Sequence, residues 1–191
     1  MTGTAKDRLL HAFPALIREQ SLASLTLDHI CEAAQAHRGS FYHAFADKQA
    51  WAEASLDVLW ADSRTLLDNC FSASKPPAVR LSDYLMLLQD RQCSSSGCIS
   101  GCPFFTFGVS LGQPEPSLRE KIREILVEYK RYLETTIRDG QAEGIFRDGD
   151  PDTLTNAAFH AIEGALSHAR ILQSPDPVLA LEGTLGLILD C

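Results

Sequence analysis

Apolar residues recur at intervals of three and four along almost the whole chain, and no stretch sustains the apolar and polar alternation of a half-buried strand. Residues 118–140 show the pattern most clearly, because Leu118 and Ile122 share one helical face while charged residues occupy the other. Segments rich in Pro, Gly and Ser interrupt the pattern, for example at 72–77 and 113–117. The chain is therefore expected to be all-α, with nine helices.

The composition argues against a disordered chain and against a membrane-spanning one. The chain has 191 residues, of which 45% are hydrophobic and 22% charged, so it is long enough to bury a sizeable core. Its longest apolar runs, at 103–111 and 183–189, are far shorter than the roughly 20 residues that a membrane-spanning helix needs. The N-terminal residues show no apolar signal region. We expect a cytoplasmic protein without membrane contact.

Residues 25–48 are the most informative segment and have the layout of a helix-turn-helix. Two short helical segments flank a tight turn, and the second carries Arg38, Tyr42 and His43 instead of a continuous apolar face. Gly39 costs about 1 kcal/mol inside a helix relative to alanine, and close approach to a DNA backbone would offset that cost. The pattern predicts that the second helix enters the major groove of DNA. The alternative is an ordinary three-helix bundle whose third helix is polar.

Two motifs connect this segment with a family. The spacing Thr-x-x-x-Ile-x-x-x-Ala begins at Thr26, and Arg-Gly-Ser-Phe-Tyr-x-x-Phe-x-x-Lys follows at residues 38–48. With these motifs and the nine-helix pattern, the chain resembles the tetracycline-repressor (TetR) family of bacterial transcription regulators over essentially its whole length. The resemblance implies a helix-turn-helix DNA-binding domain at residues 1–47 and a C-terminal ligand-binding and dimerisation domain at residues 48–191.

The resemblance also implies which residues meet DNA. Thr26 and Lys48 would contact phosphates, whereas Phe41 and Phe45 would lie in the core. The family usually has histidine directly before the second phenylalanine of the motif, but this chain has alanine there and His43 one position earlier, so whether His43 replaces that contact stays open. The implied DNA-binding residues are Thr26, Ala36, His37, Arg38, Gly39, Tyr42, His43 and Lys48.

The charge of the chain limits how it can bind DNA. A net charge of −8 argues against a protein that coats nucleic acid through overall basicity. Residues 1–60 carry five lysines and arginines against seven aspartates and glutamates, a net charge of −2. Affinity must therefore come from focused contacts by Arg38, Lys48 and the backbone donors at the helix N-termini near Thr26 and Asp47.

Six cysteines in a chain without a secretion signal favour reduced thiols, a metal site or a redox switch over a disulfide framework. Cys93, Cys98 and Cys102 lie in or beside a Ser/Gly loop and are redox candidates, with Arg91 as the nearby cation that would activate a thiol. The spacing lacks paired Cys-x2-Cys, and the loop has no His, Asp or Glu to complete four ligands, so no metal site is predicted. Alternatively, Cys93 and Cys98 are incidental, and the resemblance implies that Cys102 packs at the start of a helix.

Aromatic residues of the C-terminal region either form plain core or line an apolar effector cavity. Core packing is the default interpretation of each, while the family resemblance, which implies an effector-binding domain, favours a cavity for some of them. His160 and His168 lie two helical turns apart, too far to chelate one ion closely. The candidate pocket residues are Trp60, Phe104, Phe107, Tyr129 and His160.

Small residues line one face of the segment that follows Asp150, and the last helical segment is rich in leucine. Small side chains let two helices approach closely, so the last two helices of each subunit are expected to form an isologous four-helix contact in a homodimer. The candidate interface residues are Ala157, Ala161, Ala165 and Leu185.

The sequence predicts a regulator rather than an enzyme. It contains no nucleophile elbow, no phosphate-binding glycine loop and no metalloprotease His-Glu pair, and no cofactor is predicted. We expect a dimeric DNA-binding repressor that a small apolar or aromatic effector releases from a palindromic operator. Two alternatives remain: a redox or electrophile sensor that uses Cys93 and Cys98 on the same scaffold, and a helical protein-interaction module without DNA binding.

Overall fold

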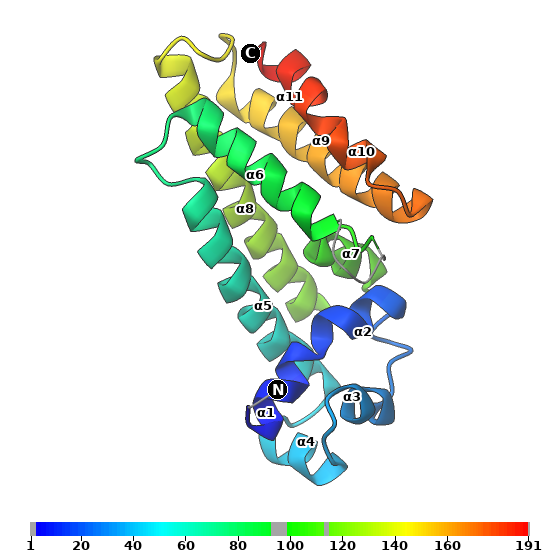
Figure 1. The fold of residues 1–191 in the computed structure, drawn as a ribbon. Coiled ribbons are helices and arrows are strands. Elements are labelled where there is room, and N and C mark those ends of the chain that lie inside the picture. Colours follow the sequence, from blue (N-terminus) through cyan, green and yellow to red (C-terminus); the bar gives the residue numbers. More distant parts are fainter. Residues whose placement is uncertain (1–2, 93–98, 113–114, 191) are drawn as a thin grey trace. The chain divides into compact units, whose positions relative to one another are not determined.

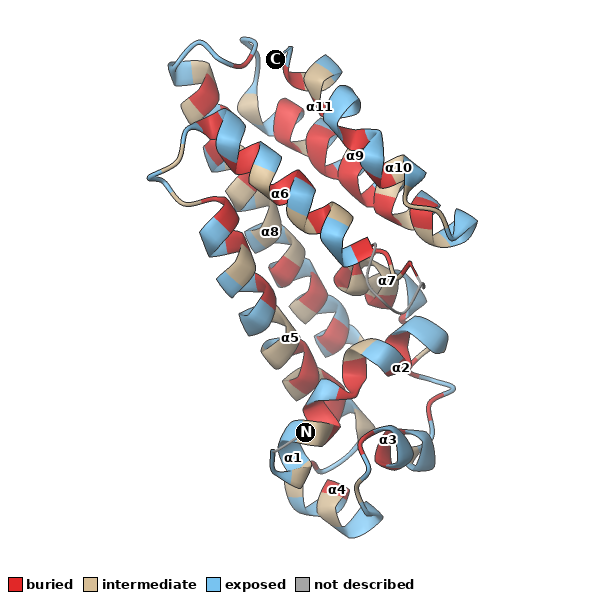
Figure 2. Ribbon diagram, viewed as in Figure 1, coloured by how far each residue is buried: buried red, intermediate tan, exposed pale blue. Residues whose placement is uncertain are grey.

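The computed structural model describes residues 3–92, 99–112 and 115–190, and all regular structure in these residues is α-helical (Figure 1). This confirms the all-α prediction. Most helices carry a buried stripe on one side and exposed residues on the other, as Figure 2 shows for α6 and α9. No helix among the described residues is both long and apolar enough to cross a membrane.

The described residues contain eleven helical segments. They are α1 (Ala5–His11), α2 (Phe13–Glu19), α3 (Leu27–Ala33), α4 (Arg38–Ala44), α5 (Lys48–Cys70), α6 (Pro77–Gln92), α7 (Pro103–Ser110), α8 (Pro116–Ala142), α9 (Pro151–Leu172), α10 (Asp176–Leu179) and α11 (Leu181–Leu189). The first two segments together occupy the predicted first helix, and the last two together occupy the predicted last helix. Counted in this way, the described chain has the predicted nine-helix architecture.

The break between α1 and α2 has a local cause. The helical pattern alone suggests one first helix that bends at Pro14, but Ala12 ends α1 and also precedes α2. Proline lacks the backbone N–H that a helix interior requires, and here Pro14 occupies the first turn of α2, where that donor is not needed. Pro14 therefore starts a new helix.

Contacts divide the chain into two compact units. The first comprises residues 1–64 and 103–125, and the second comprises residues 65–102 and 126–191. The predicted domain boundary at residue 47 falls inside the first unit, because the Phe13 ring packs edge-on against Trp51 of α5 at 5.3 Å and Phe107 of α7 at 5.2 Å. These three side chains are fully buried, and the Trp51 indole N–H donates to the Leu9 carbonyl at 2.9 Å.

Two local features shape the second unit. The buried Arg80 of α6 donates to the Asp139 carboxylate of α8 at 2.6 Å and to the Lys75 carbonyl at 2.8 Å, so its charge is compensated. Gly140 leaves room for the ring of Phe146, because a Cβ at this position would lie 2.0 Å from that ring. The chain can therefore fold back closely over the end of α8.

Candidate functional site

Helices α3 and α4 form a helix-turn-helix that packs on α1. Thr26 caps α3, because its side chain accepts from the His29 N–H at 3.3 Å, and the His29 Nδ1 accepts from the Thr26 N–H at 3.4 Å. The turn passes through Gln35, whose φ of 49° lies in the left-handed region, and the Ala36 N–H then donates to the Cys31 carbonyl at 2.8 Å. The predicted tight turn is thus present.

Arg8 of α1 holds this turn in place. Its Nε donates to the Ala34 carbonyl at 3.1 Å, and its Nη2 donates to the Gln35 carbonyl at 3.3 Å. These carbonyls lie at the C-terminal end of α3, where helix carbonyls lack partners within the helix. Sequence reasoning missed Arg8, because a single arginine on an amphipathic helix has no local signature of a contact 26 residues away.

Helix α4 presents a polar, exposed side. Phe41 and Phe45 are buried as predicted, at 1% and 6% exposure, whereas Tyr42 is 63% exposed. His37 caps the helix without a side-chain hydrogen bond. A Cβ added at Gly39 would meet nothing within 4 Å, so packing inside the chain does not require glycine at this position.

Arg38 at the start of α4 forms an ion pair with Asp28 in the first turn of α3. The guanidinium Nε donates to Asp28 Oδ1 at 2.7 Å, and Nη2 donates to Oδ2 at 2.5 Å. The hydrogen bond with Arg38 lowers the pKa of Asp28, and the same contact raises the pKa of Arg38. Both side chains are more than half exposed, so the pair adds little stability but orients the guanidinium. The sequence charge count included Asp28 but did not reveal this pairing.

Lys48, the last residue of the motif, donates hydrogen bonds to backbone carbonyls. Its Nζ donates to the carbonyls of Leu22 at 2.6 Å and Leu25 at 2.8 Å, in the segment that joins α2 to α3. The start of α5 is thereby tied to the helix-turn-helix. The phosphate contact implied for Lys48 stays a prediction, and it would have to be made by an ammonium group that these carbonyls already surround.

The structure therefore gathers the predicted DNA-binding residues in one short region of the first unit. Thr26, His37, Arg38, Gly39, Tyr42 and His43 are exposed, while Ala36 and Lys48 are half-buried. The ion pair with Asp28 sets the N-terminal end of α4 beside the first turn of α3. A backbone and side-chain surface of this kind can meet the phosphates and base edges of a groove.

The predicted pocket residues are distributed over both units. In the first unit, Trp60 packs edge-on against Phe104 at 5.8 Å, and Phe107 is fully buried against Phe13. In the second unit, the Tyr129 hydroxyl lies 2.7 Å from the hydroxyl of the buried Tyr84. His160 is exposed on α9.

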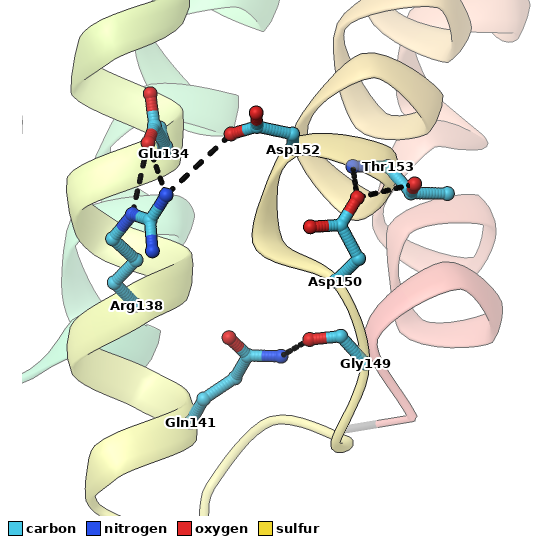
Figure 3. A network of polar contacts seen from close by, with 7 residues as sticks. All are labelled: Glu134, Arg138, Gln141, Gly149, Asp150, Asp152 and Thr153. Carbon is cyan, nitrogen blue, oxygen red and sulfur yellow. Dashed lines mark hydrogen bonds and ion pairs between the residues drawn. The ribbon is translucent and has the colours of Figure 1, made fainter.

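A cavity of about 220 Å³ lies between α8 and α9 in the second unit, and sequence reasoning did not predict it. Its lining residues are Val127, Lys130, Arg131, Glu134, Asp152, Thr155 and Asn156. Arg138 pairs with both Glu134 and Asp152, at 2.7 Å and 3.5 Å, and so joins the two helices at this point (Figure 3). The acidic groups of this cavity thus already have a cationic partner.

Of the three predicted redox cysteines, only Cys102 lies among the described residues. Cys93 and Cys98 lie outside the described residues, and Cys102 is a buried thiol. Among the described residues no cluster of His, Cys, Asp and Glu could hold a metal ion.

The predicted interface residues differ in their burial. Ala157 is exposed on α9, Ala161 and Ala165 are half-buried, and Leu185 is buried within its own unit at 2% exposure.

Comparisons with known proteins agree with this architecture. Residues 9–54 match the family model for bacterial regulatory proteins of the tetR family, and residues 85–182 match the tetracyclin repressor-like C-terminal domain. The fold and the helix-turn-helix thus define a DNA-binding transcriptional regulator. The chain belongs to the TetR family, whose members are regulators and not enzymes.

Two curated relatives align with nearly the whole chain. The transcriptional regulator AcuR of Cereibacter sphaeroides is 28% identical over 184 residues, which cover 95% of this chain and 84% of AcuR. The HTH-type transcriptional repressor DhaR of Mycobacterium sp. (strain GP1) is 27% identical over 175 residues, which cover 91% of this chain and 86% of DhaR.

Solved structures show the same fold. The regulatory protein TetR from Rhodobacter sphaeroides has a TM-score of 0.90 and 28% identity, and the match covers 98% of this chain and 100% of that one. The reduced form of E. coli NemR has a TM-score of 0.85 at 20% identity, and the match covers 98% of each chain.

We predict that Lys48→Met lowers the free energy of unfolding by about 1–3 kcal/mol, because buried carbonyls lose a charged hydrogen-bond donor. Urea unfolding monitored by circular dichroism measures the loss. Lys6→Met, which removes an exposed lysine on α1, serves as the control and should change stability by less than about 0.5 kcal/mol. Equal stability of the Lys48 variant and the parent would contradict the carbonyl contacts.

Proposed function

We propose that this chain is a homodimeric repressor that reads a palindromic operator through α4 and is released by a small apolar or aromatic effector. The proposal that α4 reads DNA rests on the contrast between its buried side and its exposed side. Phe41 is buried, while Arg38, Gly39, Tyr42 and His43 are exposed. A short helix that holds cationic and hydrogen-bonding side chains away from its core suits the major groove of DNA.

The roles of the individual residues follow from their positions. Arg38 would exchange its exposed partner Asp28 for base edges, with guanine as the preferred one because a guanidinium binds its O6 and N7 together. Tyr42, His43 and Thr26 would bind phosphates and so fix the register of the helix. Gly39 would let the backbone approach DNA, since the open space at its Cβ position faces away from the protein.

Support for repression and for a palindromic site comes from the relatives and from symmetry. DhaR is named as an HTH-type transcriptional repressor, and the chain aligns with 86% of its length. A two-fold symmetric dimer presents two copies of α4 to two half-sites, so an inverted repeat is the matching DNA.

The proposed dimer contact lies on α9 and α11, which pack together in the second unit. Small positions on α9 are exposed, including Ala157 and Gly164, and Leu187 on α11 is 85% exposed. An exposed leucine and exposed small residues on two packed helices would suit a surface that another helix pair covers. Because Leu185 is buried within its own unit, Leu187 replaces it in this proposal.

The effector is proposed to bind among the aromatic residues of the second unit. Tyr129 contacts Phe159 edge-on at 6.4 Å, and Tyr84 contacts Phe71 at 5.0 Å, so aromatic surface is concentrated here. An effector that binds one conformer of the dimer more tightly than the other shifts the population toward that conformer. Release from DNA follows when the preferred conformer is the one that does not fit the operator.

We predict that Arg38→Ala and Tyr42→Ala each weaken operator binding by about 1–3 kcal/mol, because each removes a direct contact to DNA. Arg38→Ala should also relax the preference for one base pair. Electrophoretic mobility shifts at fixed salt measure both effects.

Arg123→Ala is the matched control for these variants. It removes one exposed arginine from α8, where Arg123 pairs with Glu120, and it leaves α4 unchanged. The control should bind the operator like the parent. If both α4 variants also bind like the parent, α4 is not the reading helix.

We predict that Gly164→Arg produces a monomer that no longer binds the operator. A Cβ at Gly164 meets nothing within 4 Å, so the unit should fold normally, but a buried, uncompensated arginine would prevent association. Light scattering should give twice the chain mass of 21.0 kDa for the parent and for the control Ala78→Arg, which alters an exposed position on α6. A parent that is monomeric at micromolar concentration, or a Gly164→Arg dimer, would exclude this interface.

A further inference from the structure

Glu163 of α9 is a buried acid whose carboxylate oxygens have no N–H or O–H donor within hydrogen-bond distance among the described residues. Its exposure is 2%, and it lies on the inner side of the helix. Burying an acceptor without a donor costs free energy, and burying a charge without a counter-ion costs more. A glutamate in this position therefore needs an explanation other than packing.

The groups around Glu163 come from three other parts of the second unit. Burial raises the pKa of the phenols of Tyr84 of α6 and Tyr129 of α8, and the nearby charge of Glu163 makes a smaller contribution in the same direction. Their hydroxyl groups are 2.7 Å apart. The Cys102 thiol lies beside the carboxyl group and is a weak donor to it.

The charges near this cluster leave Glu163 uncompensated. Arg91 of α6 is exposed and acts only weakly on Tyr129. Lys130 of α8 lies 5.8 Å from the centre of the Phe159 ring, but its ammonium group donates to Asn156 at 3.1 Å. The burial of Glu163 raises its pKa to about 7, and a hydrogen bond with the Cys102 thiol lowers this pKa only in part.

An ionised carboxylate accepts hydrogen bonds and cannot donate them. The group that would satisfy two such oxygens must therefore bring N–H or O–H donors and, to compensate the charge, should be a cation. Aromatic faces favour a bound cation as well, and two are available here: Tyr129, near Glu163, and Phe159, which contacts Tyr129 and precedes Glu163 by about one turn of α9. A primary ammonium group has three donors, enough for both carboxylate oxygens and one tyrosine hydroxyl.

We propose that Glu163 anchors the ammonium group of an aromatic or apolar primary amine, which binds between the carboxylate and the Tyr84–Tyr129 pair. This assigns a chemical class to the effector and rests on the effector role proposed above for the second unit. Arylalkylamines have the required positive charge and the required apolar surface. Their ammonium groups pair with the Glu163 carboxylate, and their rings pack against the neighbouring aromatic side chains.

Binding of such a ligand should depend on pH with a definite sign. The amine stays protonated between pH 6 and pH 8, whereas Glu163, with a pKa of about 7, is mostly ionised at pH 8 and mostly neutral at pH 6. The carboxylate form is the one that pairs with the cation. Affinity should therefore fall about tenfold from pH 8 to pH 6, which is the ratio of the ionised fractions.

Isothermal titration calorimetry of the full chain with benzylamine, without DNA, tests the proposal. We expect saturable binding at pH 8 that weakens about tenfold at pH 6, and weaker binding of the neutral isostere benzyl alcohol. Glu163→Gln should reduce the affinity for benzylamine by about tenfold or more, because it removes the charged acceptor. The control Glu143→Gln, at an exposed position after α8, should bind like the parent.

A second measurement does not depend on any variant. The carboxyl carbon resonance of Glu163 in the parent should titrate near pH 7, and benzylamine should move that midpoint to lower pH. Equal binding of benzylamine and benzyl alcohol, unchanged affinity in a folded Glu163→Gln protein, or a midpoint that benzylamine does not move would overturn the proposal.

These results separate the amine site from the proposed function. If benzylamine does not bind but the protein still binds its operator, the amine site is wrong and the DNA-reading function stands. If benzylamine binds through Glu163 but no operator is bound, the amine site stands and the repressor function is wrong.

Discussion

Helix α4, the proposed DNA-reading helix, depends on the burial of two phenylalanines. Helix α4 has seven residues, and an isolated helix of that length is not stable in water. Phe41 and Phe45 bury one side of it, their rings 5.5 Å apart, and the helix packs on α1. These contacts stabilise the helix. The exposed side chains on its other side are therefore not needed for folding and are available for binding.

Polar contacts then define where this helix points. Arg8 fixes the end of α3, the Arg38–Asp28 pair joins α4 to the start of α3, and Lys48 ties the beginning of α5 to the α2–α3 connection. Each of these joins segments that are at least ten residues apart. A helix that binds in a DNA groove needs a fixed orientation. Its side chains can form hydrogen bonds with bases and phosphates only when the helix is placed accurately.

The sequence predicted what depends on local pattern. Helical periodicity located the helices, and the motif ending at Lys48 pointed to the family, whose resemblance implied the burial of Phe41 and Phe45. The local pattern did not reveal the carbonyl partners of Lys48 or the ion pair at Arg38, because both depend on how helices meet. Leu185 is buried and Leu187 is exposed for the same reason. A leucine-rich segment does not show which of its leucines packs inside its own unit.

Glu163 illustrates a further limit of sequence reasoning. An acid among alanines on an amphipathic helix is ordinarily expected on the exposed face. Here the packing of α6 and α8 against α9 turns it inward beside Tyr84 and Tyr129, so its buried acceptors become visible only in three dimensions. In the proposed mechanism, a ligand bound at this acid would shift the balance between conformers that bind DNA and those that do not.

Two copies of α4 are proposed to read symmetric DNA. Footprinting of the parent protein on the DNA upstream of its own gene tests this most directly. We predict a protected inverted repeat whose half-sites are separated by roughly one or two helical turns. Protection of a single asymmetric half-site, or no protected site at a salt concentration where the dimer is intact, would contradict it.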